Sequence, residues 1–509
     1  MYSTEALSSR WMSQRFVRAY RTAMIESARV RSPTCRLPAG WGLALLLLVS
    51  PAAAQDATNE IARHAEAAKQ AQARGDFATA IQELTALARL LPERADVQSN
   101  LGLAYFFHNQ PKEALAAFEK ALRIEPDLVS ALIFSGIAHQ TLSEPARATP
   151  LLQRAIALEP ADPLAHTWLA HSYVAQARPR EAVDHFLIAS RHAPRDVDVW
   201  YGLGQAYLHL GREAVMRLAE IAPRGARLAQ LSGDIWLLRG EPQNALTMYE
   251  EALKRRPALV ELTPVIDQLR QRQGTEPQRD LPAPARPTPD TSSPEDAQYL
   301  AATDFRERAQ RAFEQISAID PDSYRAHQVM AESLEAQERV DEAIDEYRRV
   351  LRAKPDLPSV HLAIGNLLMS EGRAREALDE YREELRVRPE ESEVHYRMGR
   401  SFVVLGMADD GEASLTRALE LADPPAAVQR ELGRLYLTRG KAGYAVRALS
   451  KYVGSSDNDA SAHYLLMQAY RALGDATAAE RHLAIYERLS ARDEQDASLK
   501  NALSIFSRR

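Results

Sequence analysis

Prolines recur along this chain at a fixed interval, and this interval constrains the fold more than any other feature of the sequence. Pro92, Pro126, Pro160 and Pro194 follow one another, each thirty-four positions after the one before. Self-similarity at such a period indicates a repeated unit that buries its apolar side against its neighbours. Because proline interrupts a helix and restricts the residue before it, each proline is expected to separate one helical unit from the next.

Small and large residues return at fixed positions between these prolines. Small residues allow two helices to approach closely, and aromatic or leucine side chains fill the remaining space. We therefore predict a stack of two-helix units, with glycines where a helix stops and turns. The clearest unit holds Leu101, Gly102, Tyr105, Ala114, Phe118 and Ala121. The predicted turn glycines are Gly75, Gly211, Gly240, Gly372, Gly406, Gly440 and Gly474.

One unit matches the first-helix signature W-x2-L-G-x2-Y in every position, at Trp200, Leu203, Gly204 and Tyr207. On these residues the chain resembles the tetratricopeptide repeat family, over roughly residues 60–270 and 299–488. The resemblance implies an all-α fold, an α-solenoid of about 12 helix pairs in two tandem arrays. It also implies that the first helices line a concave groove, which can hold a protein or peptide partner.

The regular interval fails in a way that is repeated. Pro194 and Pro223 are only twenty-nine positions apart, so one unit is five residues short. Residues around this short unit align with like residues ninety-eight positions later, which suggests that a piece longer than one repeat was duplicated. The aligned residues are Tyr201, Pro223, Gln230, Tyr249 and Pro257 with Tyr299, Pro321, Gln328, Tyr347 and Pro355.

A proline-rich segment lies between the two predicted arrays. Residues 273–296 contain six prolines, a density that opposes helix formation and favours an extended, solvated linker. We predict a first array over residues 55–272 and a second array over residues 297–488. Residues 489–509 are expected to form a polar capping helix, which the exposed end of a solenoid requires.

The segment over residues 1–54 predicts a secretory signal peptide. Two arginines, Arg31 and Arg36, precede an apolar run over residues 41–49, and three alanines at residues 52–54 follow it before Gln55. These are the three parts of an export signal. We expect cleavage near Ala54/Gln55 and a periplasmic or secreted protein of presumed bacterial origin. The apolar run is short for a membrane span, so a retained anchor is the alternative.

The N-terminal segment also bears on charge, cysteine chemistry and the start of translation. The formal net charge is −6, and residues 1–54 hold seven arginines and two glutamates, so their removal gives −6 − 7 + 2 = −11. This charge gives no reason to expect nucleic acid as a partner. The only cysteine is Cys35, so the mature chain would have no disulfide and no thiolate metal site. Either Met1 or Met24 could be the start.

Six histidines occupy the fourth position of predicted first helices. A single zinc ion needs nitrogen ligands at about 2 Å, whereas equivalent positions on packed helices lie about 8–10 Å apart. A packed ring in the place that Trp200 takes elsewhere is therefore favoured over a metal site, with pH-dependent stability as the minor alternative. The histidines are His64, His166, His327, His361, His395 and His463.

No known catalytic motif accompanies these features. The sequence has no G-x-S-x-G elbow, no H-E-x-x-H pair and no P-loop lysine motif. Acidic pairs such as Glu250–Glu251 and Glu383–Glu384 fit the charge pattern of solvated helix faces. We therefore predict that the protein is not an enzyme and has no catalytic, cofactor-binding or metal-binding residues.

The resemblance places positions 2, 5, 9, 12 and 13 of each first helix in the groove. In the second array, position 9 and one neighbouring position 5 hold polar or basic residues, which could grip backbone amides or carboxylates of a partner. In the first array the lining is largely apolar, which favours contact with a partner. The polar residues are Asn366, Arg400, Arg430, Arg434 and Gln468. The apolar ones are Phe106, Phe107, Ile133, Ile137, Val174, Tyr201, Leu208, Leu237 and Leu238.

Taken together, these features predict a non-catalytic scaffold for protein–protein interaction in the periplasm or cell envelope. It would bind a protein or peptide partner in its concave grooves, without a cofactor and without nucleic acid. Contact with a membrane is expected only if the signal segment is retained as an anchor. The alternative is a structural spacer or assembly component of an export or envelope-biogenesis complex, and solvated polar positions would then explain the basic residues.

Overall fold

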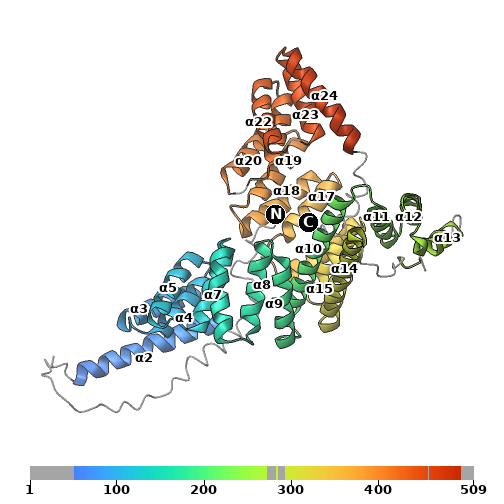
Figure 1. Cartoon of the computed structure of the whole chain (residues 1–509). Coiled ribbons are helices and arrows are strands. Elements are labelled where there is room, and N and C mark those ends of the chain that lie inside the picture. Colours follow the sequence, from blue (N-terminus) through green and yellow to red (C-terminus); the bar gives the residue numbers. More distant parts are fainter. Residues whose placement is uncertain (1–50, 272–281, 285–292, 423, 457, 494–509) are drawn as a thin grey trace. The chain divides into compact units, whose positions relative to one another are not determined.

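The computed structural model describes residues 51–271, 282–284, 293–422, 424–456 and 458–493 (Figure 1). Regular structure within these ranges is entirely helical, which confirms the all-α prediction. The predicted signal peptide falls almost wholly outside the described residues, as do Met1, Met24 and Cys35. No helix in the described ranges is long and apolar enough to cross a membrane.

Helix pairs make up most of the fold, and proline is the first residue of many of these helices, where its missing N–H costs nothing. The first four pairs are α2 and α3 (Pro51–Arg74, Phe77–Leu90), α4 and α5 (Ala95–Phe107, Pro111–Ile124), α6 and α7 (Val129–Thr141, Pro145–Leu158), and α8 and α9 (Pro163–Ala175, Pro179–His192). A fifth pair, α11 and α12 (Ala226–Leu238, Pro242–Arg255), precedes η1 (Val260–Leu262) and α13 (Thr263–Gln271).

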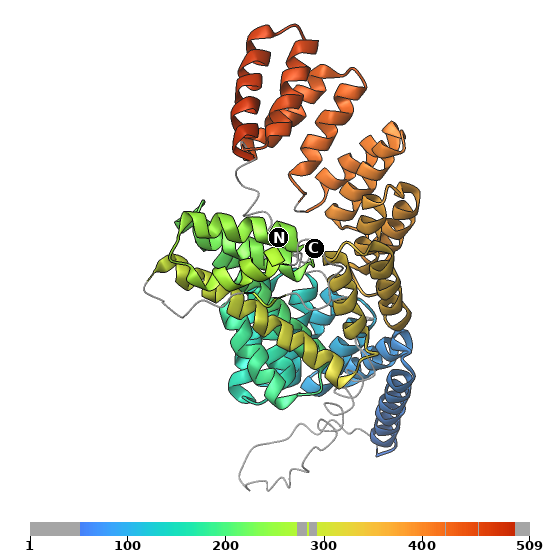
Figure 2. The ribbon, with the colours of Figure 1, turned by 90° about the vertical axis from the view of Figure 1, so that its right-hand side faces the viewer.

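Five further pairs follow in the C-terminal part of the chain, where Figure 2 shows them stacked one after another. They are α15 and α16 (Tyr324–Ala336, Val340–Ala353), α17 and α18 (Val360–Ser370, Ala374–Val387), α19 and α20 (Ser392–Val404, Ala408–Glu420), α21 and α22 (Ala427–Thr438, Ala442–Ser455), and α23 and α24 (Ala460–Ala472, Ala476–Asp493).

Two long helices interrupt the series of pairs. The short unit of the sequence is the single helix α10 (Val197–Ile221), and its counterpart in the later copy is α14 (Pro294–Ile319). The described residues thus form ten pairs and these two long helices, compared with the prediction of about 12 helix pairs. The turn predicted at Gly211 is wrong, because this residue lies inside α10, where the missing five residues remove the loop. The six other predicted turn glycines have positive φ, as a helix end requires.

The core follows the repeat. One apolar cluster unites residues of α2 to α5, including Leu84, Leu101 and Ala117, and another unites residues of α19 to α22, including Leu415 and Leu432. Each cluster therefore joins a pair to its neighbour. This is the packing of a solenoid, in which no unit buries its apolar face alone.

Glycine at position 8 lets the two helices of a pair make close contact. A Cβ on Gly102 would lie 2.6 Å from the ring of Phe118, and a Cβ on Gly136 would lie 2.6 Å from Leu152. In each case the partner stands sixteen positions later, on the second helix of the same pair. The same relation holds for Gly233 with Tyr249, Gly365 with Tyr381, Gly399 with Leu415, and Gly433 with Leu449.

Replacing Gly365 by leucine is expected to lower the free energy of unfolding by about 1–3 kcal/mol, because the added side chain must displace the buried ring of Tyr381. Gly443→Leu is the matched control, since a Cβ there meets nothing within 4 Å and leucine favours a helix over glycine. Urea unfolding followed by circular dichroism measures both variants. Equal losses would contradict the packing role of position 8.

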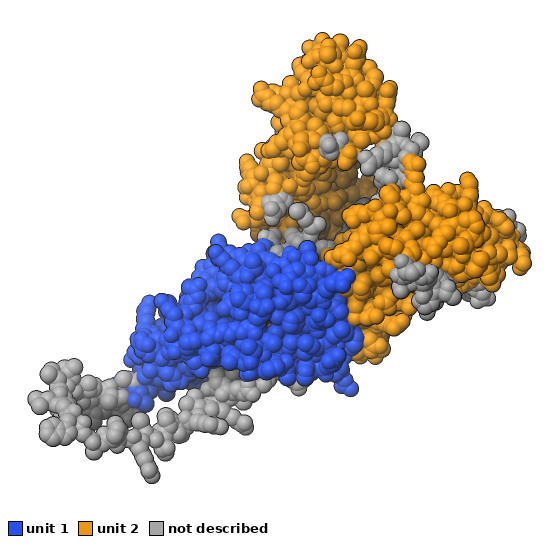
Figure 3. All heavy atoms as spheres, in the orientation of Figure 1, with its two compact units in different colours: residues 1–203 blue, residues 204–509 orange. Residues whose placement is uncertain are grey.

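The chain divides into two compact units, Met1–Leu203 and Gly204–Arg509 (Figure 3). The division falls within α10, so the proline-rich segment lies inside the second unit. Helix α14 begins at Pro294, which places the last three residues of the predicted linker in a helix, with proline at its first position. Residues 489–493 continue α24, and the rest of the predicted capping helix lies outside the described residues. The predicted limits of the two arrays stay a prediction.

Candidate partner-binding surface

Most of the predicted apolar groove of the first array is core. Phe106 is 2% exposed and contacts the rings of Phe107 and Phe134 at centroid distances of 5.8 and 6.2 Å. Phe107 is partly buried and stacks on Phe77 at 5.3 Å. Phe106 is therefore not available to a partner, contrary to the prediction. Buried with it are Ile133, Ile137, Leu208 and Leu237, whereas Tyr201 and Val174 are partly buried and Leu238 is exposed.

The reason is that successive first helices cover one another. Helix α6 contacts both α4 and α8, and nine of its 13 residues are buried. Its apolar residues therefore surround the helix instead of forming one stripe, which is typical of a buried helix. The positions that the resemblance assigns to the groove therefore include residues that the next first helix covers, and the sequence alone does not separate the two kinds.

Two of the predicted polar residues in the second array form polar contacts within the protein. Asn366 accepts a hydrogen bond of 3.0 Å from the hydroxyl of Tyr381, the ring that packs against Gly365. Arg430 lies 2.7 Å from Asp459 Oδ2, which also accepts a 2.8 Å hydrogen bond from Tyr452. Burial opposes the charged form of Asp459, but hydrogen bonds from Ser461, Tyr452 and Arg430 outweigh it and lower its pKa to about 2. Arg430 thus ties α21 to the start of α23.

The other three polar residues remain accessible on successive first helices. Arg434 is exposed and its guanidinium lies 2.6 Å from Glu431, while Gln468 is exposed on α23. Arg400 lies over the ring of Tyr396 at 5.8 Å. Its Nε atom is buried and has no hydrogen-bond partner among the described residues. A buried N–H without an acceptor is costly.

Two accessible side chains on the same helices were missed in the sequence. Val404, at position 13 of α19, and Tyr464, at position 5 of α23, are both exposed. Their positions are among those that the resemblance assigns to the groove, so a position-by-position reading would have found them. We define the position-nine surface as Arg400, Arg434 and Gln468 with Val404 and Tyr464.

Comparison with known proteins identifies the repeat. Models of the tetratricopeptide repeat match residues 95–128, 169–215, 300–367, 362–427 and 396–460. The chain belongs to the tetratricopeptide repeat family. This confirms the resemblance that rests on Trp200, Leu203, Gly204 and Tyr207. Arg400, Val404 and Arg434 of the position-nine surface lie within the matched residues, whereas Tyr464 and Gln468 lie beyond residue 460.

The individual proteins and structures that match this chain have low sequence identity to it. Anaphase-promoting complex subunit 3 of Schizosaccharomyces pombe is 26% identical over 197 residues, which are 31% of this chain and 30% of that protein. The solved structure of YrrB, described as a tetratricopeptide protein with an unusual peptide-binding site, is 18% identical with a TM-score of 0.31 and covers 37% of this chain and 97% of its own. The pilus biogenesis factor PilW is 25% identical with a TM-score of 0.34, covering 41% and 94%.

The position-four rings of these tetratricopeptide pairs act within each pair. His64, His327 and His361 place Nδ1 within 2.6–2.7 Å of a glutamate nineteen positions later, on the second helix. In two other pairs the partner is a second histidine: His166 meets His185, and His463 meets His482. Among the described residues, no group of three or more His, Cys, Asp or Glu side chains is arranged to hold a metal ion.

In some units the ring nitrogen at position four also contacts the carbonyl of the preceding proline. Trp200 Nε1 donates a 2.9 Å hydrogen bond to the carbonyl of Pro194, six residues earlier. His166 Nε2 lies 3.0 Å from the carbonyl of Pro160 in the same relation. A flat ring with an N–H therefore satisfies a carbonyl that has no helical partner, which explains why histidine can replace tryptophan at this position.

The two histidine pairs are expected to make stability fall in acid. Burial, reinforced by the neighbouring ring, lowers the pKa of His185 and of His482. In the unfolded chain both histidines keep the ordinary pKa of about 6.5. The unfolded chain therefore binds protons at a higher pH than the folded chain does, and the free energy of unfolding decreases as the pH falls below that value. The double variant His185→Gln/His482→Gln should show a smaller drop in Tm between neutral pH and pH 5. An unchanged drop would contradict this cause.

Proposed function

We propose that this protein is a non-catalytic scaffold that binds a protein or peptide partner on the position-nine surface. Tetratricopeptide repeats support a role in protein–protein interaction. The observation that carries the proposal is that Arg400, Arg434 and Gln468 recur at the same position of three successive first helices and are all at least partly accessible. A carboxylate or carbonyl oxygen of a partner could accept hydrogen bonds from the guanidinium groups of Arg400 and Arg434 and from the amide of Gln468.

The spacing of the repeat suggests the form of the partner. Neighbouring first helices pack about 8–10 Å apart, and an extended chain advances about 3.3 Å per residue. An extended segment with an acidic or amide side chain at about every third residue would therefore meet Arg400, Arg434 and Gln468 in turn. Val404 and Tyr464 add apolar area at the edges of this contact.

The test is a charge reversal with a matched control. Partners are first identified by crosslinking in the native envelope followed by mass spectrometry, and binding of a purified partner is then measured. Arg400→Glu/Arg434→Glu should weaken binding by at least tenfold, as loss of central charged contacts does. Arg382→Glu/Arg386→Glu makes the same charge change on α18, where both arginines are exposed, and should leave binding unchanged. Equal binding by all variants would favour the spacer or assembly role instead.

We further propose that the protein acts in the periplasm or outside the cell. The support is the signal-like sequence of residues 1–54, with its apolar run and alanine-rich site. Mass spectrometry of the protein from its native cell should find Gln55 at or near the N-terminus. Recovery of the uncut chain from the membrane fraction would instead indicate a retained anchor, and recovery from the cytoplasm would refute export.

A further inference from the structure

The two long helices are linked by an unusual contact. In six pairs the glycine at position 8 receives a side chain that stands sixteen positions later, on the second helix of the same pair. Gly204 of α10 has no such helix, because α10 continues without a turn. Its place is taken by Phe313, which belongs to α14 on the far side of the proline-rich segment. Helix α14 therefore supplies the second helix that the α10 repeat lacks.

Equivalent residues of the two helices meet each other. Tyr207 and Phe305 differ by the same ninety-eight positions as the duplicated pieces, and their rings stack at a centroid distance of 6.3 Å. The residues that this shift assigns to Gly204 and Phe313 are Ala302 and Val215, and both are fully buried. Contact between equivalent positions is what a twofold interface produces. The contact of Phe313 with Gly204 and the stacking of Tyr207 on Phe305 thus place α14 against the α10 repeat.

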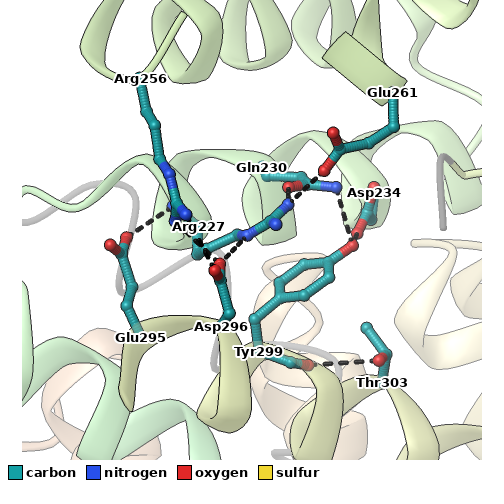
Figure 4. Close-up of polar contacts among 9 residues, drawn as sticks. All are labelled: Arg227, Gln230, Asp234, Arg256, Glu261, Glu295, Asp296, Tyr299 and Thr303. Atoms are coloured by element: carbon teal, nitrogen blue, oxygen red, sulfur yellow. Dashed lines mark hydrogen bonds and ion pairs between the residues drawn. The ribbon is translucent and has the colours of Figure 1, made fainter. Parts of the chain in front are cut away.

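The first half of α14 also completes α11. The N-cap residue of α11 is Gly225, which has no side chain to accept the free backbone N–H groups. Glu295 of α14 takes this role, since its Oε1 atom accepts a 2.8 Å hydrogen bond from the N–H of Arg227 (Figure 4). The helix end of α11 is therefore satisfied by a residue from beyond the proline-rich segment.

A buried polar cluster joins α14 to α11 and to the end of α12 (Figure 4). Asp296 binds the guanidinium groups of Arg227 and Arg256, with two contacts of 2.9 Å to Arg256. The hydroxyl of Tyr299 donates to Asp234 at 2.7 Å and lies 3.0 Å from the amide of Gln230. Without α14, Arg227 would keep Glu261 and Asp234 would keep Tyr249, but each would lose one of its buried partners, and removing a partner from a buried charge is unfavourable.

We propose that residues 204–256 form a docking site whose ligand is α14 of the chain's own second half, so that the two halves stay bound when the segment between them is cut. The partner is thus a 26-residue helix that presents Glu295, Asp296, Tyr299 and Phe313. The site and its ligand belong to one chain, and covalent linkage raises the effective concentration of α14, which favours docking within one chain over docking between copies.

The experiment cuts the folded full-length chain. A protease recognition sequence replaces residues 285–290, and the cut protein is analysed by size-exclusion chromatography with light scattering at low micromolar concentration. We expect both pieces to elute together with the mass of one full chain. Gly204→Leu fills the place of Phe313 and should weaken the association of the pieces about 10- to 100-fold, the range for overpacking. Asp296→Asn tests the polar cluster from the α14 side and should also weaken it.

The control is Gly443→Leu, which adds the same side chain at a position where a Cβ meets nothing within 4 Å and should leave the association unchanged. Separation of the unmodified pieces on cutting would overturn the proposal. So would retention of both pieces with no difference between Gly204→Leu, Asp296→Asn and the control, because another contact would then hold them. A species with twice the mass of the chain would show that α14 docks on a second copy, which contradicts docking within one chain.

Discussion

Replacing Asp296 by alanine is expected to lower the free energy of unfolding by about 3–5 kcal/mol, the cost of breaking a buried ion pair by removing one partner. Asp296 is 2% exposed and binds two arginines, of which Arg227 is 4% exposed. Its removal leaves the buried guanidinium of Arg227 with Glu261 as its remaining anionic partner among the described residues. The measurement is urea unfolding of the full chain, followed by circular dichroism.

The control for this variant lies on the same helix. Asp304 forms an ion pair of 2.8 Å with Arg308, but both side chains are about half exposed, and an exposed pair contributes at most about 1 kcal/mol. Asp304→Ala should therefore change stability little. If both variants lost the same free energy of unfolding, the loss would come from a general weakening of α14 and not from the buried polar cluster.

The carboxyl of Asp296 should also make this region sensitive to acid. Burial opposes its charged form, but hydrogen bonds from Arg256 and Arg227 outweigh burial and lower its pKa. A carboxyl whose pKa is lowered on folding stabilises the fold above its unfolded value of about 3.9 and loses that contribution as the pH falls. The difference in stability between the native chain and Asp296→Ala should therefore shrink below pH 4.

The helix pairs could be predicted from the sequence because they depend on local and periodic features. In six pairs position 8 is glycine where the ring or leucine of the second helix must come close, and both residues stand in one repeat. The turn glycines likewise act through their own φ angles. The small residue at position 8 and the turn glycine both recur along the chain, so the pattern can be recognised in the sequence without knowledge of tertiary contacts.

The long helices and the exact groove could not be predicted in the same way. The shortened interval at Pro194–Pro223 shows that residues are missing, but a short pair and one continuous helix fit that interval equally well. What decides between them is Phe313, which is distant from Gly204 in the sequence and replaces the absent helix. Phe106 was misplaced for a related reason, since its burial depends on aromatic rings of neighbouring pairs.

The adjacent acidic residues Glu383 and Glu384 differ strongly in burial. Both were interpreted as part of a solvated helix face, and for Glu383 this is correct, because its side chain is 42% exposed and pairs with Arg386. Glu384 is completely buried, so the interpretation is wrong for this residue. It faces the N-terminus of α17, whose N-cap residue Ser359 has a left-handed backbone and makes no side-chain cap of its own.

Glu384→Gln is therefore expected to cost about 3–5 kcal/mol of stability, the range for removing one member of a buried ion pair, whereas Glu383→Gln should be nearly neutral. The carboxylate of Glu384 accepts hydrogen bonds from the N–H groups of Ser359 and Leu362 at 2.8 and 3.2 Å. It also accepts a bond of 2.9 Å from Arg388, which is 7% exposed.

The amide of glutamine has only one oxygen for these donors. Its NH2 group would point at a backbone N–H or at the guanidinium, and Arg388 would keep its ion pair with Glu391. The two variants differ by one position and remove the same formal charge, so net charge cannot explain a difference between them. Equal unfolding midpoints in urea would show that the cap of α17 contributes nothing, and that its first turn is held by packing alone.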